Sequence, residues 1–184
     1  WQQYGITEEH LNKYNIKAVK ECWLNDSLWK RYSTKNPIYR YLFNGKYKIY
    51  CPLEPDKRHK WISNTSKNTI QNWDNIDWTK DLIFITSSYK DSIVLNILGY
   101  NAVAMPQETP IINLKFTKYL ESKFKKVILF YNNDEQGLSA ADKVSKTNSI
   151  PYIYVPEMFE CKDPSEFVKS YGYEFVKEVI ESKI

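Results

Sequence analysis

The chain has 184 residues, a hydrophobic content of 42% and a formal net charge of +4 at pH 7. This length and apolar content suit one domain or two small ones with a real core, and the modest basic excess permits a polyanionic partner without proving one. No apolar run approaches the roughly 18 residues of a membrane span, so no membrane partner is expected. Cys22, Cys51 and Cys161 lie far apart without a CxxC pair, which argues against a zinc site and for reduced thiols in the cytoplasm.

We expect residues 1–80 to form a small mixed α+β subdomain. Thr7 is a candidate N-cap for a short helix, and Asn44-Gly45 is a strong signal for the tight turn of a hairpin. The expected elements are a helix, two strands and a hairpin, over residues 7–16, 16–24, 37–43 and 44–53.

Residues 81–184 show the alternation of strand and helix patterns that is typical of an α/β domain. Short apolar runs rich in β-formers alternate with segments of helical spacing, which predicts a four-stranded parallel sheet flanked by helices. The expected strands are 81–86, 100–105, 126–131 and 150–155. The expected helices are 87–99, 112–124, 135–147 and 164–172, with a continuation over 173–183.

Polar residues follow each expected strand, at the edge of the sheet where open α/β folds bind ligands. They are Thr86, Ser87, Ser88, Gln107, Glu108, Asn132, Asn133, Asp134, Lys162 and Asp163. Asp134 and Asp163 occupy equivalent places after successive strands, which favours a divalent metal ion. Each also precedes a helix, so each could be only an N-cap, and Asp163 with Glu166 makes a nearly ideal capping box. The two interpretations are compatible, because a capping carboxylate can leave one oxygen free.

Three blocks of the second half carry a resemblance to a known family. They are "FITSSYKDSIVLNILGYNAVA", "ILFYNNDEQGLSAA" and "CKDPSEFV". Residues 82–171 resemble the Toprim domain of topoisomerases, bacterial replicative primases and phage primases. In the first half, "YGITEEHLNKYNI" is similar to the opening of the primase catalytic core, and "GKYKIYCPL" with "HKWISN" resembles its basic hairpin region. The resemblance covers nearly the whole chain and best matches phage-type primases or primase–helicases.

The acidic motif of that family is depleted here. Ser87 stands where the family has Glu, and Ser88 where it has Gly. Asn132 replaces the first Asp of Asp-x-Asp, and Ser165 the second Asp of the third block. Asp134 and Asp163 remain as the metal ligands that the resemblance implies. They predict one Mg²⁺ or Mn²⁺ rather than two, since Mg²⁺ needs only one or two carboxylates when substrate phosphates complete its shell.

The resemblance implies a primase core that makes RNA primers on single-stranded DNA from ribonucleotides. Asp134, Asp163 and Lys60 are then the candidate catalytic residues, and the candidate nucleic-acid or nucleotide contacts are Lys60, Lys67, Lys46 and Arg58. The resemblance also implies a replicative helicase, fused or separate, as partner. The sequence starts at Trp1 rather than Met, which is typical of a piece of a longer protein. The depleted motif keeps a second hypothesis open, a degenerate Toprim module that binds nucleic acid or acts as a scaffold. A Toprim nuclease is a third, less favoured because the first half resembles a primase core.

Overall fold

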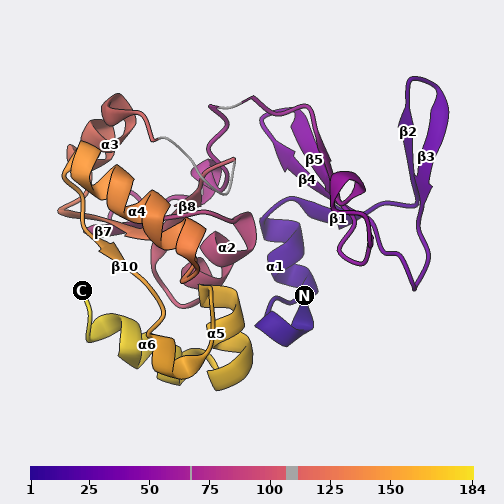
Figure 1. Ribbon diagram of the computed structural model, residues 1–184. Helices are drawn as coiled ribbons and strands as arrows, with labels where there is room; N and C mark the ends of the chain where they lie inside the picture. Colours follow the sequence, from indigo (N-terminus) through magenta and orange to yellow (C-terminus); the bar gives the residue numbers. More distant parts are fainter. Residues whose placement is uncertain (67, 107–111) are drawn as a thin grey trace. The chain divides into compact units, whose positions relative to one another are not determined.

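The computed structural model of the chain describes residues 1–66, 68–106 and 112–184 (Figure 1). The chain folds as two compact units. We call Trp1–Ile6 together with Ile70–Ile184 the α/β unit, and Thr7–Thr69 the small unit. The domain boundary that the sequence predicts after residue 80 stays a prediction. Within the described residues, no helix is long and apolar enough to cross a bilayer.

The α/β unit contains the predicted four-stranded parallel sheet, in the order β10-β9-β7-β8. Its strands are β7 (Leu82–Thr86), β8 (Asn101–Ala104), β9 (Lys126–Phe130) and β10 (Tyr152–Ile153). Its α-helices are α2 (Tyr89–Ile97), α3 (Leu114–Glu121), α4 (Glu135–Asn148), α5 (Pro164–Tyr171) and α6 (Tyr173–Glu181). Short 3-10 helices lie at η1 (Gln2–Tyr4), η3 (Trp73–Asn75) and η4 (Glu157–Phe159). The α/β prediction is therefore confirmed.

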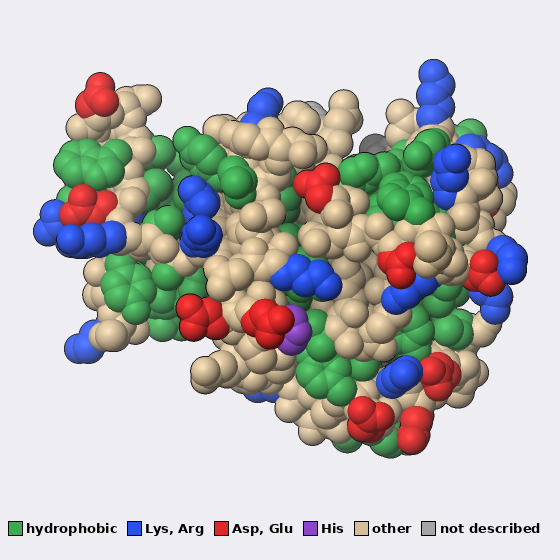
Figure 2. All heavy atoms as spheres, turned by 180° about the vertical axis from the view of Figure 1, so that it is seen from behind, with side chains coloured by type: hydrophobic (Ala, Val, Ile, Leu, Met, Phe, Trp, Pro, Cys, Tyr) green, Lys and Arg blue, Asp and Glu red, His purple; other side chains and the backbone are tan. Residues whose placement is uncertain are grey.

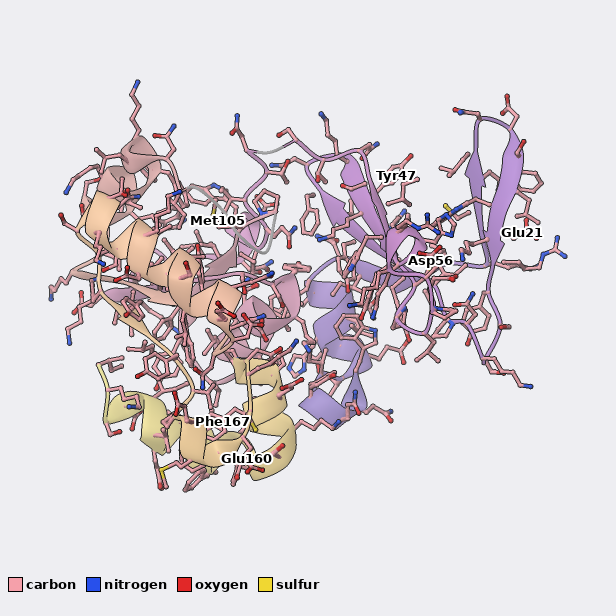
Figure 3. All side chains as sticks on the ribbon, in the orientation of Figure 1. Glu21, Tyr47, Asp56, Met105, Glu160 and Phe167 are labelled. Atoms are coloured by element: carbon pink, nitrogen blue, oxygen red, sulfur yellow. The ribbon has the colours of Figure 1, made fainter. Side chains whose placement is uncertain are left out.

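Both faces of this sheet are buried, which explains why its strands lack polar alternation. Alternate residues of the strands, such as Ile83 and Leu129, pack in one apolar cluster with Leu120 of α3 and Val144 of α4. The residues between them are buried on the other face, where α2 packs against β7 and β8 and α5 packs against α2. Phe167 on α5 is 1% exposed and is visible below the sheet in Figure 3.

Residues from the beginning of the chain belong to this unit. The hydroxyl of Tyr173, at the start of α6, donates a 2.8 Å hydrogen bond to the carbonyl oxygen of Tyr4. Gly5, at φ 66°, brings its backbone so close to the Tyr173 ring that a Cβ would overlap it. The segment 1–6 is thus packed against the last helices of the chain.

Two predicted elements of the α/β unit differ in extent from the structure. The strand predicted over 150–155 is reduced to β10, because Pro151 and Pro156 flank it and proline has no N–H to donate to a neighbouring strand. The last helical region is broken at Gly172, whose φ of 80° ends α5 and starts α6 in a new direction.

The small unit combines α1 (Glu8–Lys13) with an antiparallel sheet of order β1-β4-β5-β6 and a separate two-stranded ribbon. The sheet strands are β1 (Ile16–Ala18), β4 (Tyr39–Phe43), β5 (Lys46–Tyr50) and β6 (Trp61–Ser63). The ribbon strands are β2 (Glu21–Leu24) and β3 (Ser27–Arg31), and η2 (Lys57–His59) precedes β6. Ile38, Ile49 and Cys51 form the centre of its core. This is the mixed α+β arrangement that the sequence predicts.

Local signals placed the turns of the small unit better than its strand ends. The Thr7 hydroxyl accepts a hydrogen bond from the backbone N–H of His10, which confirms the predicted cap of α1. Asn44 and Gly45 have φ values of 47° and 75°, as a tight hairpin turn between β4 and β5 requires. The single strand predicted over 16–24 is wrong, because the chain leaves β1 to form the β2–β3 ribbon, which turns at a second pair of positive-φ residues, Asn25 and Asp26.

Candidate active site at the strand ends

The loops after β7 and β9 meet through a neutral hydrogen bond. These central strands are paired, so their carboxyl ends lie side by side. The Ser87 hydroxyl donates to Oδ1 of Asn132 at 3.1 Å. These are the two positions where the resemblance expects a glutamate and an aspartate. Two uncharged side chains that hydrogen-bond to each other therefore stand at the centre of the sheet edge.

Asp134 caps the helix that follows β9. Its Oδ1 accepts the backbone N–H of Gly137 at 2.8 Å, and the residue is exposed, so the carboxylate has capacity for a further ligand. Gly137 itself has to be a glycine, because a Cβ there would overlap the carbonyl oxygen of Asn132. The predicted cap is confirmed, and a metal-binding role stays a prediction.

Asn133 ties the loop of Asp134 to the loop of Asp163. Its backbone N–H donates to the carbonyl oxygen of Lys162 at 2.6 Å, and its side-chain amide donates to the carbonyl oxygen of Val155 at 2.8 Å. The two predicted carboxylates therefore stand on neighbouring, cross-linked loops.

Asp163 caps α5 and is buried. Its Oδ1 accepts the backbone N–H of Glu166 at 2.7 Å, which confirms the predicted cap. The reciprocal half of the predicted capping box differs, because Oε2 of Glu166 accepts the backbone N–H of Lys162, the residue before the cap, at 3.1 Å rather than that of Asp163. Burial, and then the nearby charge of Asp91, raise the pKa of Asp163 to about 6, although Lys90 opposes this. Its second oxygen, Oδ2, lies 4.0 Å from Nζ of Lys90.

The structure adds a carboxylate to this edge, that of Asp91 on α2. Asp91 is 1% exposed, and its Oδ1 accepts both the backbone N–H of Ser165 at 3.2 Å and the Ser165 hydroxyl. The Ser88 hydroxyl, at the N-cap of α2, accepts the backbone N–H of Asp91 at 3.3 Å. The missed signal was its position three and four residues before the buried Val94 and Leu95, on the apolar face of α2.

Lys90 lies between the two buried carboxylates and an aromatic ring. Its ammonium is 4.2 Å from the ring centroid of Tyr4, and its side chain is 26% exposed. Burial disfavours the charged form, but Asp163 and Asp91 outweigh this and raise the pKa of Lys90. Sequence reasoning gave Lys90 no role.

The predicted basic contacts belong to the small unit, apart from Lys67, which lies outside the described residues, as do Gln107 and Glu108. Arg58 pairs with Asp56 through two hydrogen bonds of 3.1 and 2.8 Å, so its charge is largely matched. Lys60 ends η2 and is half-buried, and Lys46 is exposed at the start of β5. Figure 2 shows Lys and Arg side chains spread over the visible face and mixed with acidic ones.

An aromatic and basic cluster lies beside these residues on β5 and β6. Trp61 stacks on Tyr50 with ring centroids 3.9 Å apart, and Nζ of Lys48 lies 4.1 Å from the centroid of the Trp61 ring. Trp61 remains 37% exposed, and Tyr47, which Figure 3 labels on β5, is 45% exposed. Exposed aromatics next to lysines are the side chains on which single-stranded bases stack.

The donor set at the strand ends fits one magnesium ion better than two. Within residues 1–66, 68–106 and 112–184, no group of three or more His, Cys, Asp or Glu side chains is arranged to hold a metal ion. Mg²⁺ keeps several waters and binds through one or two carboxylates together with substrate phosphates, so Asp134 and Asp163 stay the predicted ligands of one ion. A two-metal arrangement needs the carboxylates that Ser87, Asn132 and Ser165 have replaced.

Solved structures show where this arrangement of elements occurs. The catalytic core of DnaG matches with a TM-score of 0.71, 15% sequence identity, and coverage of 98% of this chain and 70% of that chain. The primase fragment of the bacteriophage T7 primase-helicase matches with a TM-score of 0.64, 17% identity, and coverage of 98% and 71%. The zinc-binding and RNA polymerase domains of the Aquifex aeolicus primase match with a TM-score of 0.68 and 16% sequence identity. The match covers 98% of this chain but only 54% of that chain. No protein-family model and no curated protein matches the sequence.

The chain has the fold of a Toprim primase core. This confirms the resemblance stated from the sequence, and the match extends over the small unit as well as the α/β unit. On this primase fold, Asp134 and Asp163 stand after β9 and β10 in chain order, with the Ser87–Asn132 pair on the central strands.

Proposed function

We propose that the chain is the catalytic core of a DNA primase, which synthesises short RNA primers on single-stranded DNA by Mg²⁺- or Mn²⁺-dependent nucleotidyl transfer. The observation that carries the proposal is the combination of a primase-core fold over 98% of the chain with two retained carboxylates on cross-linked loops at the carboxyl edge of the sheet. In such folds this edge is the ligand-binding edge. Residues 81–184 would carry the chemistry, and residues 1–80 would contact template and nucleotide.

The reaction is the attack of a primer 3′-hydroxyl on the α-phosphorus of a nucleotide. A phosphodiester bond forms, the bond to the β-phosphate breaks, and pyrophosphate leaves. A divalent ion, when bound, offsets the negative charge that develops on the phosphate oxygens. Asp134 and Asp163 would hold that ion, and their caps to α4 and α5 fix the direction of each carboxylate.

The small unit supplies side chains for the substrate. Lys60, Lys46 and Lys67 would contact the phosphates of the nucleotide or the template, and Arg58 would do so through the edge that Asp56 leaves free. Stacking of template bases suits the exposed ring of Trp61. One solved structure of similar fold is a DnaG primase catalytic domain bound to single-stranded DNA.

Metal titration of the Asp134→Asn variant tests the metal assignment. Asparagine caps helices about as well as aspartate, so a cap-only role predicts nearly unchanged stability and unchanged metal behaviour. The proposal predicts that calorimetric Mn²⁺ binding in the presence of nucleotide disappears and that primer synthesis is lost, while the thermal midpoint without metal is maintained. Equal Mn²⁺ binding by wild type and variant, or none by either, would contradict the assignment.

A second candidate function is a catalytically inactive Toprim module that binds nucleic acid or acts as a scaffold. The neutral Ser87–Asn132 hydrogen bond favours it, because it replaces two charges of the motif with a self-satisfied pair. A primer-synthesis assay on single-stranded template separates the two candidates. Absence of ribonucleotide product with either Mg²⁺ or Mn²⁺, together with intact DNA binding, would select the inactive module.

Further parts of the machinery are also proposals. Because the chain spans 54% to 71% of the primase structures named above, we expect further domains in the working protein. One similar structure is part of a phage primase-helicase, so a replicative helicase, fused or separate, is the proposed partner. A chain with this role would act in the cytoplasm, in a phage-infected host if it is phage-encoded.

A further inference from the structure

We propose that Lys90 is a built-in cation of the strand-end site, whose ammonium takes the place of a second divalent ion beside Asp163 and Asp91. This inference rests on the proposed function in one respect only, namely that Asp163 belongs to the ion-binding edge. It assigns a role to a residue that the Toprim resemblance does not mark.

The position of the ammonium carries the first step. Asp163 and Asp91 are both buried, at 6% and 1% exposure, and each needs a counter-charge, because an isolated buried carboxylate is costly. Lys90 Nζ lies 4.0 Å from Oδ2 of Asp163, the oxygen that the α5 cap does not use. The ammonium therefore supplies positive charge at the oxygen of Asp163 that the cap leaves free, and the ion held together with Asp134 would share this oxygen.

The charge of the cluster carries the second step. Asp91, Asp134 and Asp163 together with Lys90 carry a net charge of −2, and the nearby Lys162 also acts on Asp163 with one positive charge. Without Lys90 the same edge would carry one more negative charge, which a further cation would have to balance.

Part of the hydrogen-bonding capacity at this edge is already used by protein groups. Oδ1 of Asp91 already accepts two hydrogen bonds from Ser165, and Ser87 is engaged with Asn132. The Tyr4 ring, 4.2 Å from Lys90 Nζ, holds the ammonium from another direction by a cation–π contact. The Tyr4 ring and the Asp163 carboxylate therefore hold the Lys90 ammonium in place.

The test is to remove the charge and keep the shape. In Lys90→Met, we expect a lower thermal midpoint without divalent ions, a rise in the midpoint on adding Mn²⁺ that exceeds that of wild type, and a calorimetric Mn²⁺ affinity about tenfold tighter or a second bound ion per chain. Lys90→Arg keeps the charge and should behave as wild type does. Lys146→Met is the matched control, because Lys146 pairs with Asp142 at 2.7 Å on the exposed surface of α4, about three turns from Asp134; its Mn²⁺ response should not change.

A purely structural role gives a different result. If Lys90→Met loses stability and Mn²⁺ restores none of it, or if its Mn²⁺ titration matches that of wild type, the proposal is wrong. Should Lys90→Met be too unstable to titrate, the double variant Lys90→Met with Asp163→Asn decides. Removing both charges should recover part of the lost midpoint, whereas loss of packing alone would not be recovered.

Failure of this inference and failure of the proposed function give different results. If the wild type binds no divalent ion and makes no primer, the primase proposal fails. A gain of Mn²⁺ response in Lys90→Met would still show that Lys90 excludes an ion from this edge.

Discussion

Gly137→Ala tests whether the close approach between α4 and the loop before it sets the geometry of the site. A Cβ on residue 137 would overlap the carbonyl oxygen of Asn132 and would lie 2.9 Å from its carbonyl carbon and 3.0 Å from its Cβ. Two of these three atoms are backbone, so a side-chain rotation cannot relieve the overlap. The loop that carries Asn132 would have to move away from the helix.

The magnitude follows from two opposed effects. Overpacking of this kind costs about 1–3 kcal/mol. Alanine gains at most about 1 kcal/mol over glycine from helix propensity, and less than that in the first turn, where the backbone is only partly helical. We therefore expect Gly137→Ala to lower the free energy of unfolding by about 1–2 kcal/mol, a drop of about 2–8 °C in thermal midpoint for a chain of this size.

Thermal melts and urea titration measure this change. Ser139→Ala is the control, because Ser139 is exposed two residues further along the same helix and should gain a few tenths of a kcal/mol at most. A Gly137→Ala protein as stable as wild type, or more stable, would refute the argument that the helix and the loop are in backbone contact at this point.

Three further predictions concern other parts of the chain. The pKa of Asp163 is raised in the folded state to about 6, so between about pH 4 and pH 6 the folded state retains a proton that the unfolded state has lost. Without metal, the free energy of unfolding should therefore fall by up to about 3 kcal/mol as the pH rises through this window. Urea titrations of Asp163→Asn should show a flatter pH profile. Asn101 is buried on the edge strand β8, where its side chain accepts the backbone N–H of Asp77 at 2.9 Å and donates to the Asp77 carbonyl oxygen at 2.7 Å. Asn101→Asp places a carboxylate against that carbonyl oxygen and should lower the free energy of unfolding by about 2–3 kcal/mol; an unchanged urea midpoint would contradict this. Binding of single-stranded DNA should weaken steeply with salt, and Lys60→Ala should reduce the slope of log K against log salt by about one unit; binding that ignores salt would exclude an electrostatic contact.

The architecture of the α/β unit was accessible from the sequence because its signals are local. The run "LIFIT" is apolar at its first four positions, and the structure places it between two other strands, where both faces and both edges are covered. Caps at Asp134 and Asp163 were also predictable, since each acts on a backbone N–H three residues away. The strand predicted over 150–155 is too long, because its apolar residues favour a strand while Pro151 and Pro156 limit its pairing.

The charged cluster of the site was not accessible, because it depends on packing between distant segments. Asp91 and Ser165 are 74 residues apart and meet only when α5 docks on α2. Lys90 meets Tyr4 through the same docking, since η1 packs on α5. The motifs of the Toprim family show which carboxylates this sequence lacks, but they do not show that Lys90 lies beside the buried Asp91 and Asp163.

The contact between Tyr4 and Tyr173 has a consequence for the order of events on the ribosome. The two residues are 169 positions apart, so the segment 1–6 emerges long before the helix against which it packs. The small unit, 7–69, is contiguous and can fold as soon as it has left the exit tunnel. The α/β unit must instead wait for its last two helices and then recapture the early segment across an already folded insert. The entropic cost of such a closure grows only slowly with the length of chain between the two segments.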